Sequence, residues 1–273
     1  MISRRGQVLG YGVLNVAALV ALLPFVGVVL LSLGEPGQVG PTLSVTSATH
    51  WGNFAEVWEQ GGFTGSMTTS LVITSTVVVL SVVLSVPAGY ALALMRFRGR
   101  QVTFLLFVFG LLVPLEAMII PLYLDLRSIG LADSYWSVIL PDVGFSVAFG
   151  SFWMRAYFLG SNRTLVEAAR IDGAGSWQTL VRILLPLARP QVLTLGVLFF
   201  VWNWNDFLLP LVMLSGSDTR TAPMSLVFFQ GQHTTDYTYL AAASLITIAP
   251  VVAVYVLLQR SFTRGVLAGA VKD

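Results

Sequence analysis

Cysteine is absent from the 273 residues of this chain, and lysine occurs once, as Lys272. The lack of cysteine excludes disulfides, thiolate metal sites and cysteine nucleophiles. The single lysine excludes a phosphate-binding loop of the Walker A type, because that loop needs a lysine directly after its glycine-rich turn. His50 and His233 lie far apart in polar segments and form no metal-binding pattern, so we interpret both as solvated loop residues.

Charged residues are also scarce. They make up 10% of the chain, compared with about 25% in soluble domains. Hydrophobic residues make up 56%, and the mean hydropathy is +0.81. These values indicate a membrane protein. The pI of about 9.1 does not indicate nucleic-acid binding, because the arginines cluster at the ends of apolar runs rather than on one face.

Six apolar runs are each long enough to cross a hydrocarbon core about 30 Å thick as a helix. The runs are continuous rather than alternating, which favours helices over barrel strands. The first run is too long for the apolar part of a signal peptide and lacks a cleavage pattern, so we expect a retained helix. We therefore predict an all-α polytopic membrane protein with one transmembrane domain over residues 1–273. Its predicted spans are residues 11–33, 68–95, 103–126, 134–158, 190–213 and 240–262.

The basic residues divide unequally between the two sides that these spans define. Of the 15 arginine and lysine residues, all but Arg127 and Arg220 fall on the side that carries both termini. Short cytoplasmic loops accumulate such residues, so both termini are predicted to be cytoplasmic. On the opposite side, residues 34–66 contain a short amphipathic piece, Phe54–Trp58, which we expect to lie along the membrane surface. That segment serves either as a solvated connector or as a docking site.

The polar segment 159–189, on the cytoplasmic side, has the pattern of a helical hairpin. Thr164 and Glu167 have the spacing of a capping box. The pair Asp172 and Gly173 then predicts a turn with a positive backbone φ. A second helix is expected from Ser176, with an apolar stripe at helical spacing and with prolines at its end. The stripe is Trp177, Leu180, Val181 and Leu184, and the prolines are Pro186 and Pro190. Such a hairpin either transmits movement from a partner or anchors the loop among lipid headgroups.

Several of these residues resemble the EAA loop of the permeases of binding-protein-dependent ABC importers. The loop motif consists of Glu167, Ala168, Ala169, Asp172, Gly173 and Ala174, followed by Ile183–Leu187 and Pro190. Other segments resemble the carbohydrate-uptake, maltose-type class. They are Gly89–Leu92, Arg96–Arg100, Pro121–Tyr123, Trp204–Phe207 and Arg264–Lys272. Two departures, Thr69–Ser70 for Asn-Ser and Ser161–Asn162 for Ile-Pro, lie outside the coupling motif.

The resemblance implies a type I ABC importer permease in a bacterial or archaeal cytoplasmic membrane. Its expected partners are a second homologous permease, two copies of an ATPase subunit and an extracytoplasmic solute-binding protein. ATP and Mg²⁺ would bind to the ATPase subunits, and this chain would bind no cofactor and catalyse no covalent reaction. The residues expected to couple to the ATPase are Glu167, Ala168, Ala169, Asp172, Gly173, Ala174, Leu185 and Pro186. A second ATPase contact is expected at Gly269, Ala270 and Lys272. The expected solute is a sugar or oligosaccharide, with glycerol phosphate or its diesters as the alternative, although no basic cluster at membrane depth favours a phosphate.

Three acidic residues lie at membrane depth, where ionisable groups are costly and are therefore functional candidates. Asp206 forms a polar cluster with Asn203 and Asn205, and Glu116 lies where a broken helix could line a pathway. These four residues are the candidate pathway residues, with helix–helix hydrogen bonding as the alternative. Asp142 is interpreted as a helix break or gate.

Other classes of protein could also use membrane-embedded acids. A proton-coupled secondary transporter would use them, but we find no internal repeat, and such a carrier needs no ATPase-docking hairpin. An intramembrane protease with paired aspartates would need Asp142 and Asp206 in a protease context, and neither residue has one. A purely structural scaffold would not explain acids at membrane depth.

Overall fold

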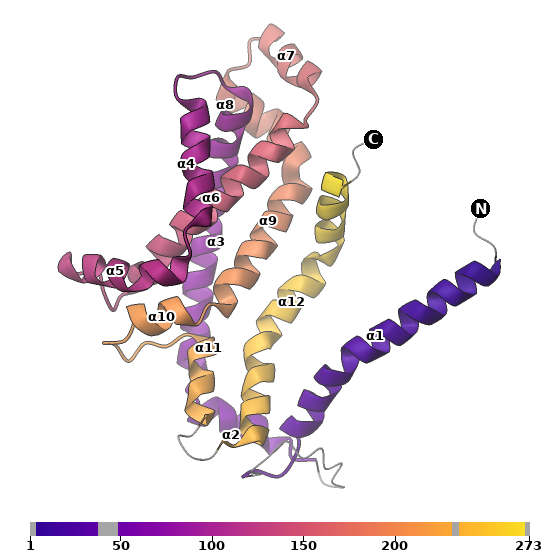
Figure 1. The fold of residues 1–273 in the computed structure, drawn as a ribbon, viewed down its shortest axis with the longest axis vertical. Coiled ribbons are helices and arrows are strands. Elements are labelled where there is room, and N and C mark those ends of the chain that lie inside the picture. Colours follow the sequence, from indigo (N-terminus) through magenta and orange to yellow (C-terminus); the bar gives the residue numbers. More distant parts are fainter. Residues whose placement is uncertain (1–3, 38–48, 231–234, 271–273) are drawn as a thin grey trace. The chain divides into compact units, whose positions relative to one another are not determined.

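The computed structural model describes residues 4–37, 49–230 and 235–270 (Figure 1). Within these ranges the secondary structure is helical, apart from one isolated bridge between Gln230 and Thr235. This confirms the predicted all-α class. The chain divides into two units, which are described in turn. The first comprises Met1–Ser66 with Met224–Ala249, and the second comprises Met67–Pro223 with Pro250–Asp273.

Five helical segments of the described residues are long and apolar enough to cross a membrane. They are α1 (Arg4–Ser32, apolar from Gly10), α3 (Phe63–Leu94), α6 (Tyr135–Leu159), the composite segment Ser176–Asn205, and α12 (Tyr237–Ala270, apolar to Gln259). The composite segment consists of α8 (Ser176–Gln178), the π-helix η1 (Thr179–Leu184) and α9 (Leu185–Asn205). The helices α4 (Arg100–Leu112) and α5 (Leu115–Ser128) form a bent pair. If the pair is counted as one broken span, it is the sixth.

The first unit joins α1, α2 (Gly52–Gln60), η2 (Leu226–Phe229) and the first turns of α12. The buried Asn53 side chain on α2 donates hydrogen bonds to the carbonyls of Ser32 and Gly34, both at 2.9 Å. At the start of α12, Asp236 Oδ1 accepts from the amides of Thr238 and Tyr239, both at 3.0 Å. Polar contacts therefore hold α2 to the end of α1 and fix the start of α12.

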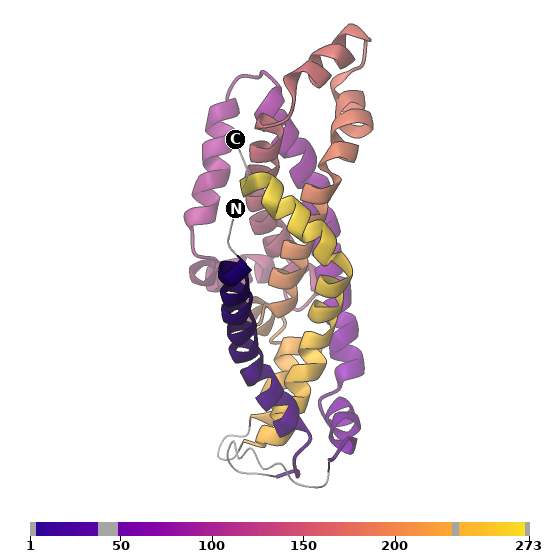
Figure 2. The ribbon, with the colours of Figure 1, turned by 90° about the vertical axis from the view of Figure 1, so that its right-hand side faces the viewer.

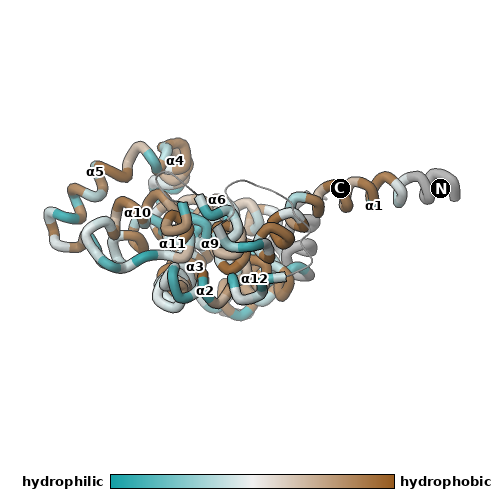
Figure 3. The backbone as a smooth tube through the Cα atoms, turned by 90° about the horizontal axis from the view of Figure 1, so that it is seen from below, coloured by the Kyte–Doolittle hydropathy of each residue, from teal (hydrophilic) through white to brown (hydrophobic). Residues whose placement is uncertain are grey.

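Helix α1 presents its apolar side chains without cover from the described protein. None of its most apolar stretch is buried, and Figure 3 shows brown, apolar residues along it. A helix that is apolar all round and uncovered needs an apolar environment, which a bilayer or another membrane subunit supplies.

The second unit has two apolar clusters, one toward each end of α3 and α6. The first cluster joins α3, α6, α7 (Arg163–Ile171), η1 and α9, and it includes Phe158, Leu184 and Phe199. The second joins α3, α5, α6 and α10 (Leu208–Met213) through residues such as Ile139 and Met213. These clusters fix the helices that carry the candidate functional residues.

Gly89 allows α3 and α6 to approach closely. A Cβ atom at Gly89 would lie 2.5 Å from the Cβ of Met154 and 2.8 Å from the amide nitrogen of Arg155. Because no side chain fits there, the two helices pack backbone against backbone, as membrane helices do at small residues.

The third predicted span, residues 103–126, is not continuous in the structure. The chain bends by 99° between α4 and α5. Val113, at the bend, is extended with φ −79° and ψ 120°. Pro114 explains the break, because proline lacks an amide donor and pushes the preceding residue out of the helical region.

The fifth predicted span, residues 190–213, was placed too far along the chain. The helix begins at Ser176 and ends at Asn205, and the separate helix α10 follows an extended Asp206. The prediction that Pro186 and Pro190 end the preceding helix is wrong, since the helix continues through both. The π-helix η1 ends at Leu184, two residues before Pro186, and local π turns allow membrane helices to accommodate proline.

Candidate functional sites at a hairpin and two helix breaks

The hairpin formed by α7 and the composite helix lies at the same end of the second unit as the corner between α3 and α4, as the views in Figures 1 and 2 agree. Helix α7 begins with Asn162, whose Oδ1 accepts from the amide of Thr164 at 3.0 Å and from its hydroxyl at 2.6 Å. The predicted capping box at Thr164 and Glu167 is therefore wrong. Asn162 is the stronger capping residue, and it leaves the Glu167 side chain exposed.

The turn after α7 has the geometry of a Schellman motif. The amide of Ala174 donates to the carbonyl of Ala169 at 2.9 Å, and the amide of Gly173 donates to the backbone carbonyl of Arg170 at 3.1 Å. Gly173 has φ +78°, which confirms the predicted positive φ. The motif provides hydrogen-bond donors for the last carbonyl groups of α7 and makes the reversal of the chain rigid.

The second arm presents a different face from the one that helical spacing predicts. Leu180 and Leu184 are buried, as expected, but Trp177 is 67% exposed and Val181 is 38% exposed. The π turn of η1 changes the number of residues per turn, so a stripe with a 3.6-residue period does not stay on one side. Together with Ile171, which is 86% exposed, Trp177 gives the hairpin tip an uncovered apolar surface. Sequence reasoning missed this surface because it assigned Trp177 to the buried stripe.

The predicted coupling residues divide into buried and exposed sets. Ala169 is buried at 3% exposure, and its neighbour Val166 packs into the first cluster. Leu185 and Ala174 are half-buried. The residues that face away from the protein core are Glu167, Ala168, Asp172, Gly173 and Pro186.

The predicted C-terminal contact is described only in part. Gly269 and Ala270 form the last turn of α12, and Lys272 lies outside the described residues. Its role therefore remains a prediction.

Two acidic residues lie at the two breaks of the membrane helices. Glu116 is in the first turn of α5, directly after the bend at Pro114. Asp206 separates α9 from α10, and its Oδ1 accepts from the amide of Leu209 at 3.4 Å, at the start of α10. Helices α5 and α10 pack against each other. In secondary transporters, discontinuous helices form the solute and ion sites, and the two breaks are candidates for the same role here.

Asp142 belongs with these two acids. Its carboxyl group lies within range of charge repulsion from Asp206, and Asp206 lies within the same range of Glu116. Asp142 is 6% exposed, and its Oδ2 has no hydrogen-bond partner in the described part of the chain. The sequence left Asp142 out of the predicted pathway residues and predicted a helix break or gate there, yet α6 continues through it. Among the described residues, no group of three acidic or histidine side chains has an arrangement that could hold a metal ion.

The two asparagines of the predicted polar cluster bind their own helix. Asn203 Nδ2 donates to the carbonyl of Phe199 and Asn205 Nδ2 to that of Val201, both at 2.7 Å. Their side-chain carbonyl groups are the parts left to accept hydrogen bonds from a solute or another helix. Of the predicted pathway residues, the packing of α5 against α10 thus places Glu116 and Asp206 within range of mutual charge repulsion.

The chain belongs to the family of binding-protein-dependent transport system inner membrane components, whose model matches residues 82–267. This confirms the family predicted from the hairpin motif. Among its relatives, the arabinooligosaccharides transport system permease protein AraQ of Halalkalibacterium halodurans is 34% identical over 264 residues, which is 93% of this chain and 92% of the relative. The diacetylchitobiose uptake system permease protein NgcG of Streptomyces coelicolor is 27% identical over 98% of this chain and 89% of its own length.

Solved structures agree with this assignment. A chain of a bacterial ABC transporter involved in the import of the acidic polysaccharide alginate superposes with a TM-score of 0.77 at 25% identity. The match covers 96% of this chain and 99% of that chain. A chain of the MetNI methionine ABC transporter, at 16% identity, has a TM-score of 0.57 over 73% of this chain and 94% of that one, and this likeness concerns the fold alone.

Proposed function

We propose that this chain forms part of the pathway by which an ABC importer moves an uncharged sugar or oligosaccharide across the cytoplasmic membrane. We propose further that its hairpin couples the ATPase subunits to the membrane helices. The supporting observation is the continuity of the segment Ser176–Asn205, which joins the hairpin to the break at Asp206. A helix of 30 residues is about 45 Å long. Movement of the hairpin would therefore be carried along one rod to the helix break.

The hairpin tip has the features of a docking element. The Schellman turn makes it rigid. Exposed apolar side chains lie at Ile171, one helical turn after Glu167, and at Trp177 beyond the chain reversal. An uncovered apolar surface of this kind favours contact with another protein. In our proposal Glu167 pairs with a basic residue of the ATPase, and ATP and Mg²⁺ bind only on that partner.

The proposal of an uncharged carbohydrate rests on two observations. Relatives are named for the transport of arabinooligosaccharides and diacetylchitobiose. Glu116 and Asp206 at the helix breaks, with Asp142 on the continuous helix α6, supply carboxyl groups. These groups can accept hydrogen bonds from sugar hydroxyls but, when ionised, would repel a phosphate or a uronate. Glycerol phosphate is therefore the weaker candidate.

The proposed assembly contains a second homologous permease, two ATPase subunits and an extracytoplasmic solute-binding protein. The uncovered apolar surface of α1 supports contact with lipid or with the second permease. We place the hairpin and both termini on the cytoplasmic side because arginine is concentrated in those segments.

The coupling role can be tested with Glu167→Lys in the assembled transporter. Charge reversal would place two positive charges opposite each other, so uptake into vesicles should fall on the order of 30-fold or more while the chain still inserts. Release of the ATPase, or ATP hydrolysis that no longer responds to the loaded binding protein, should accompany this loss. Glu59→Lys, at an exposed acid of α2 outside the predicted spans, is the matched control and should transport normally. Normal uptake by the Glu167→Lys variant would refute the coupling role.

A further inference from the structure

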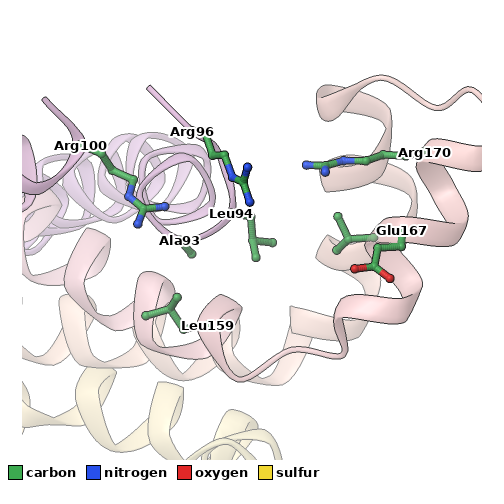
Figure 4. Close-up of a pocket in the computed structure, with 8 residues that line it drawn as sticks. Ala93, Leu94, Arg96, Arg100, Leu159, Glu167 and Arg170 are labelled. Atoms are coloured by element: carbon green, nitrogen blue, oxygen red, sulfur yellow. The ribbon is translucent and has the colours of Figure 1, made fainter. Parts of the chain in front are cut away.

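A basic cavity lies between the corner that joins α3 to α4 and the face of α7. Its volume is about 530 Å³, within the usual range for small-ligand sites. Three arginines, Arg96, Arg100 and Arg170, line it together with one acid, Glu167. In Figure 4 the guanidinium groups of Arg96 and Arg170 point toward one another across the cavity. The charged lining therefore favours an anion.

Nearby residues strengthen this positive charge. The Arg100 guanidinium donates to the carbonyl of Met95 at 3.2 Å, which holds it at the corner. Arg155 on α6 interacts electrostatically with Arg100. Its Nε donates to the carbonyl of Leu92 at 3.3 Å, and its guanidinium carbon lies 3.9 Å from the centre of the Phe104 ring. A second hollow of about 690 Å³ shares Arg96 and Arg100 and adds Arg98.

The position and the walls of the cavity indicate which anion would bind. Helices α3 and α6 end at Leu94 and Leu159, and α4 begins at Arg100. Arg96 and Arg100 therefore lie at the ends of membrane helices, and Arg170 faces them from α7. Leu94 and Leu159 also line the cavity. Phospholipid headgroups occupy this level of a membrane, with the acyl chains alongside the helices.

Helix α4 carries an exposed apolar stripe that begins at Val102, which lines the second hollow beside Arg96 and Arg100. Val102, Leu106 and Phe109 have the spacing of one helical stripe and are 61%, 64% and 63% exposed. The acyl chain of a phospholipid could lie along this stripe while the phosphate of its headgroup reaches the arginines. A soluble anion could reach the arginines but would not use the stripe.

We infer that the cavity lined by Arg96, Arg100 and Arg170 binds the headgroup of an anionic phospholipid. Basic pockets between membrane helices are suited to such headgroups, because each nearby arginine adds attraction for the anion. Binding would brace α7 against the α3–α4 corner. The inference does not depend on the coupling role of the hairpin or on the transported solute.

The test is titration of the purified full chain in detergent with phosphatidylglycerol and with phosphatidylcholine, followed by native mass spectrometry. Phosphatidylglycerol should bind in preference, and Arg96→Gln with Arg100→Gln should weaken its binding roughly 30-fold without changing that of phosphatidylcholine. Glu167→Gln should strengthen the binding of phosphatidylglycerol roughly fivefold, because it removes the opposing charge.

Controls separate this site from general charge and from misfolding. Arg127→Gln with Arg220→Gln removes two arginines elsewhere in the sequence and should leave binding unchanged. Arg96→Lys with Arg100→Lys should retain the preference, which would show that the glutamine variants lose charge rather than fold.

Three outcomes would overturn the inference. The first is an unchanged lipid preference in the Arg96→Gln, Arg100→Gln variant. The second is equal binding of inorganic phosphate, or displacement of the lipid by it at millimolar concentration, which would identify a site for soluble anions. The third is loss of the bound lipid when the chain is purified with its ATPase, which would mean that the partner protein occupies the cavity.

Discussion

Asp206 illustrates how one residue can combine a structural and a functional role. Its carboxyl group accepts a hydrogen bond from the amide of Leu209 at the start of α10. It also lies within range of charge repulsion from Asp142 and Glu116. The start of α10 needs only one hydrogen-bond acceptor. Capping of this helix by Asp206 therefore does not explain why Asp142 and Glu116 are also near. A solute with many hydroxyl groups would provide donors for these carboxyl groups.

The effect of Asp206→Asn separates these roles. Asparagine keeps an acceptor for Leu209 but removes the charge, so the complex should assemble normally. The KM for the solute should rise about tenfold or more, because a hydrogen bond to a charged group is lost. Uptake into vesicles and size-exclusion chromatography measure the two effects, with Asp125→Asn as the matched control. A disassembled complex would instead favour a role in helix–helix contact, and an unchanged KM would remove Asp206 from the pathway.

At the scale of the element, the breaks in the membrane helices matter most. One break separates α4 from α5, and the other separates α9 from α10. The α4–α5 bend turns α5, with Glu116 in its first turn, against α10, whereas a straight helix would carry α5 along the axis of α4. The segment Ser176–Asn205 instead passes through two prolines without a break. The position of a proline alone therefore does not decide whether a helix ends.

The bend at Pro114 can be measured directly, because the chain has no cysteine and accepts a pair of spin labels without other changes. Labels at the exposed positions Val102 and Leu124 should lie about 20 Å apart if the two arms meet at the observed bend, and about 33 Å apart in a straight helix. Pro114→Ala should move part of the distribution toward the longer distance, since alanine restores an amide donor. A single distance near the longer value in the unaltered chain would contradict the bend.

At the scale of the whole molecule, the distribution of arginine predicts which ends of the helices face the cytoplasm. Single cysteines at Arg98 and Asp218, introduced separately, provide the test. An impermeant maleimide added to intact cells, stripped of an outer membrane where one is present, should label the cysteine at 218. The cysteine at 98 should react only after the membrane is opened. The reverse pattern would refute the proposed orientation of the hairpin and both termini.

The sequence by itself determined the properties that depend on neighbouring residues. Six apolar runs define a polytopic helical protein, because each run is long enough to span a bilayer. The residues around Glu167 and Gly173 resemble the EAA loop of the family, and this resemblance can be read from neighbouring residues alone. The acids Glu116, Asp142 and Asp206 are visible as functional candidates because charge at membrane depth is costly.

Only the tertiary structure decided which distant residues meet. The electrostatic interactions among Glu116, Asp142 and Asp206 depend on the packing of α5, α6 and α10, and the basic cavity depends on α7 lying against the α3–α4 corner. The exposure of Trp177 depends on the π turn that follows it. Local patterns do not contain these relations, because they arise from packing between helices and from departures from regular helix geometry.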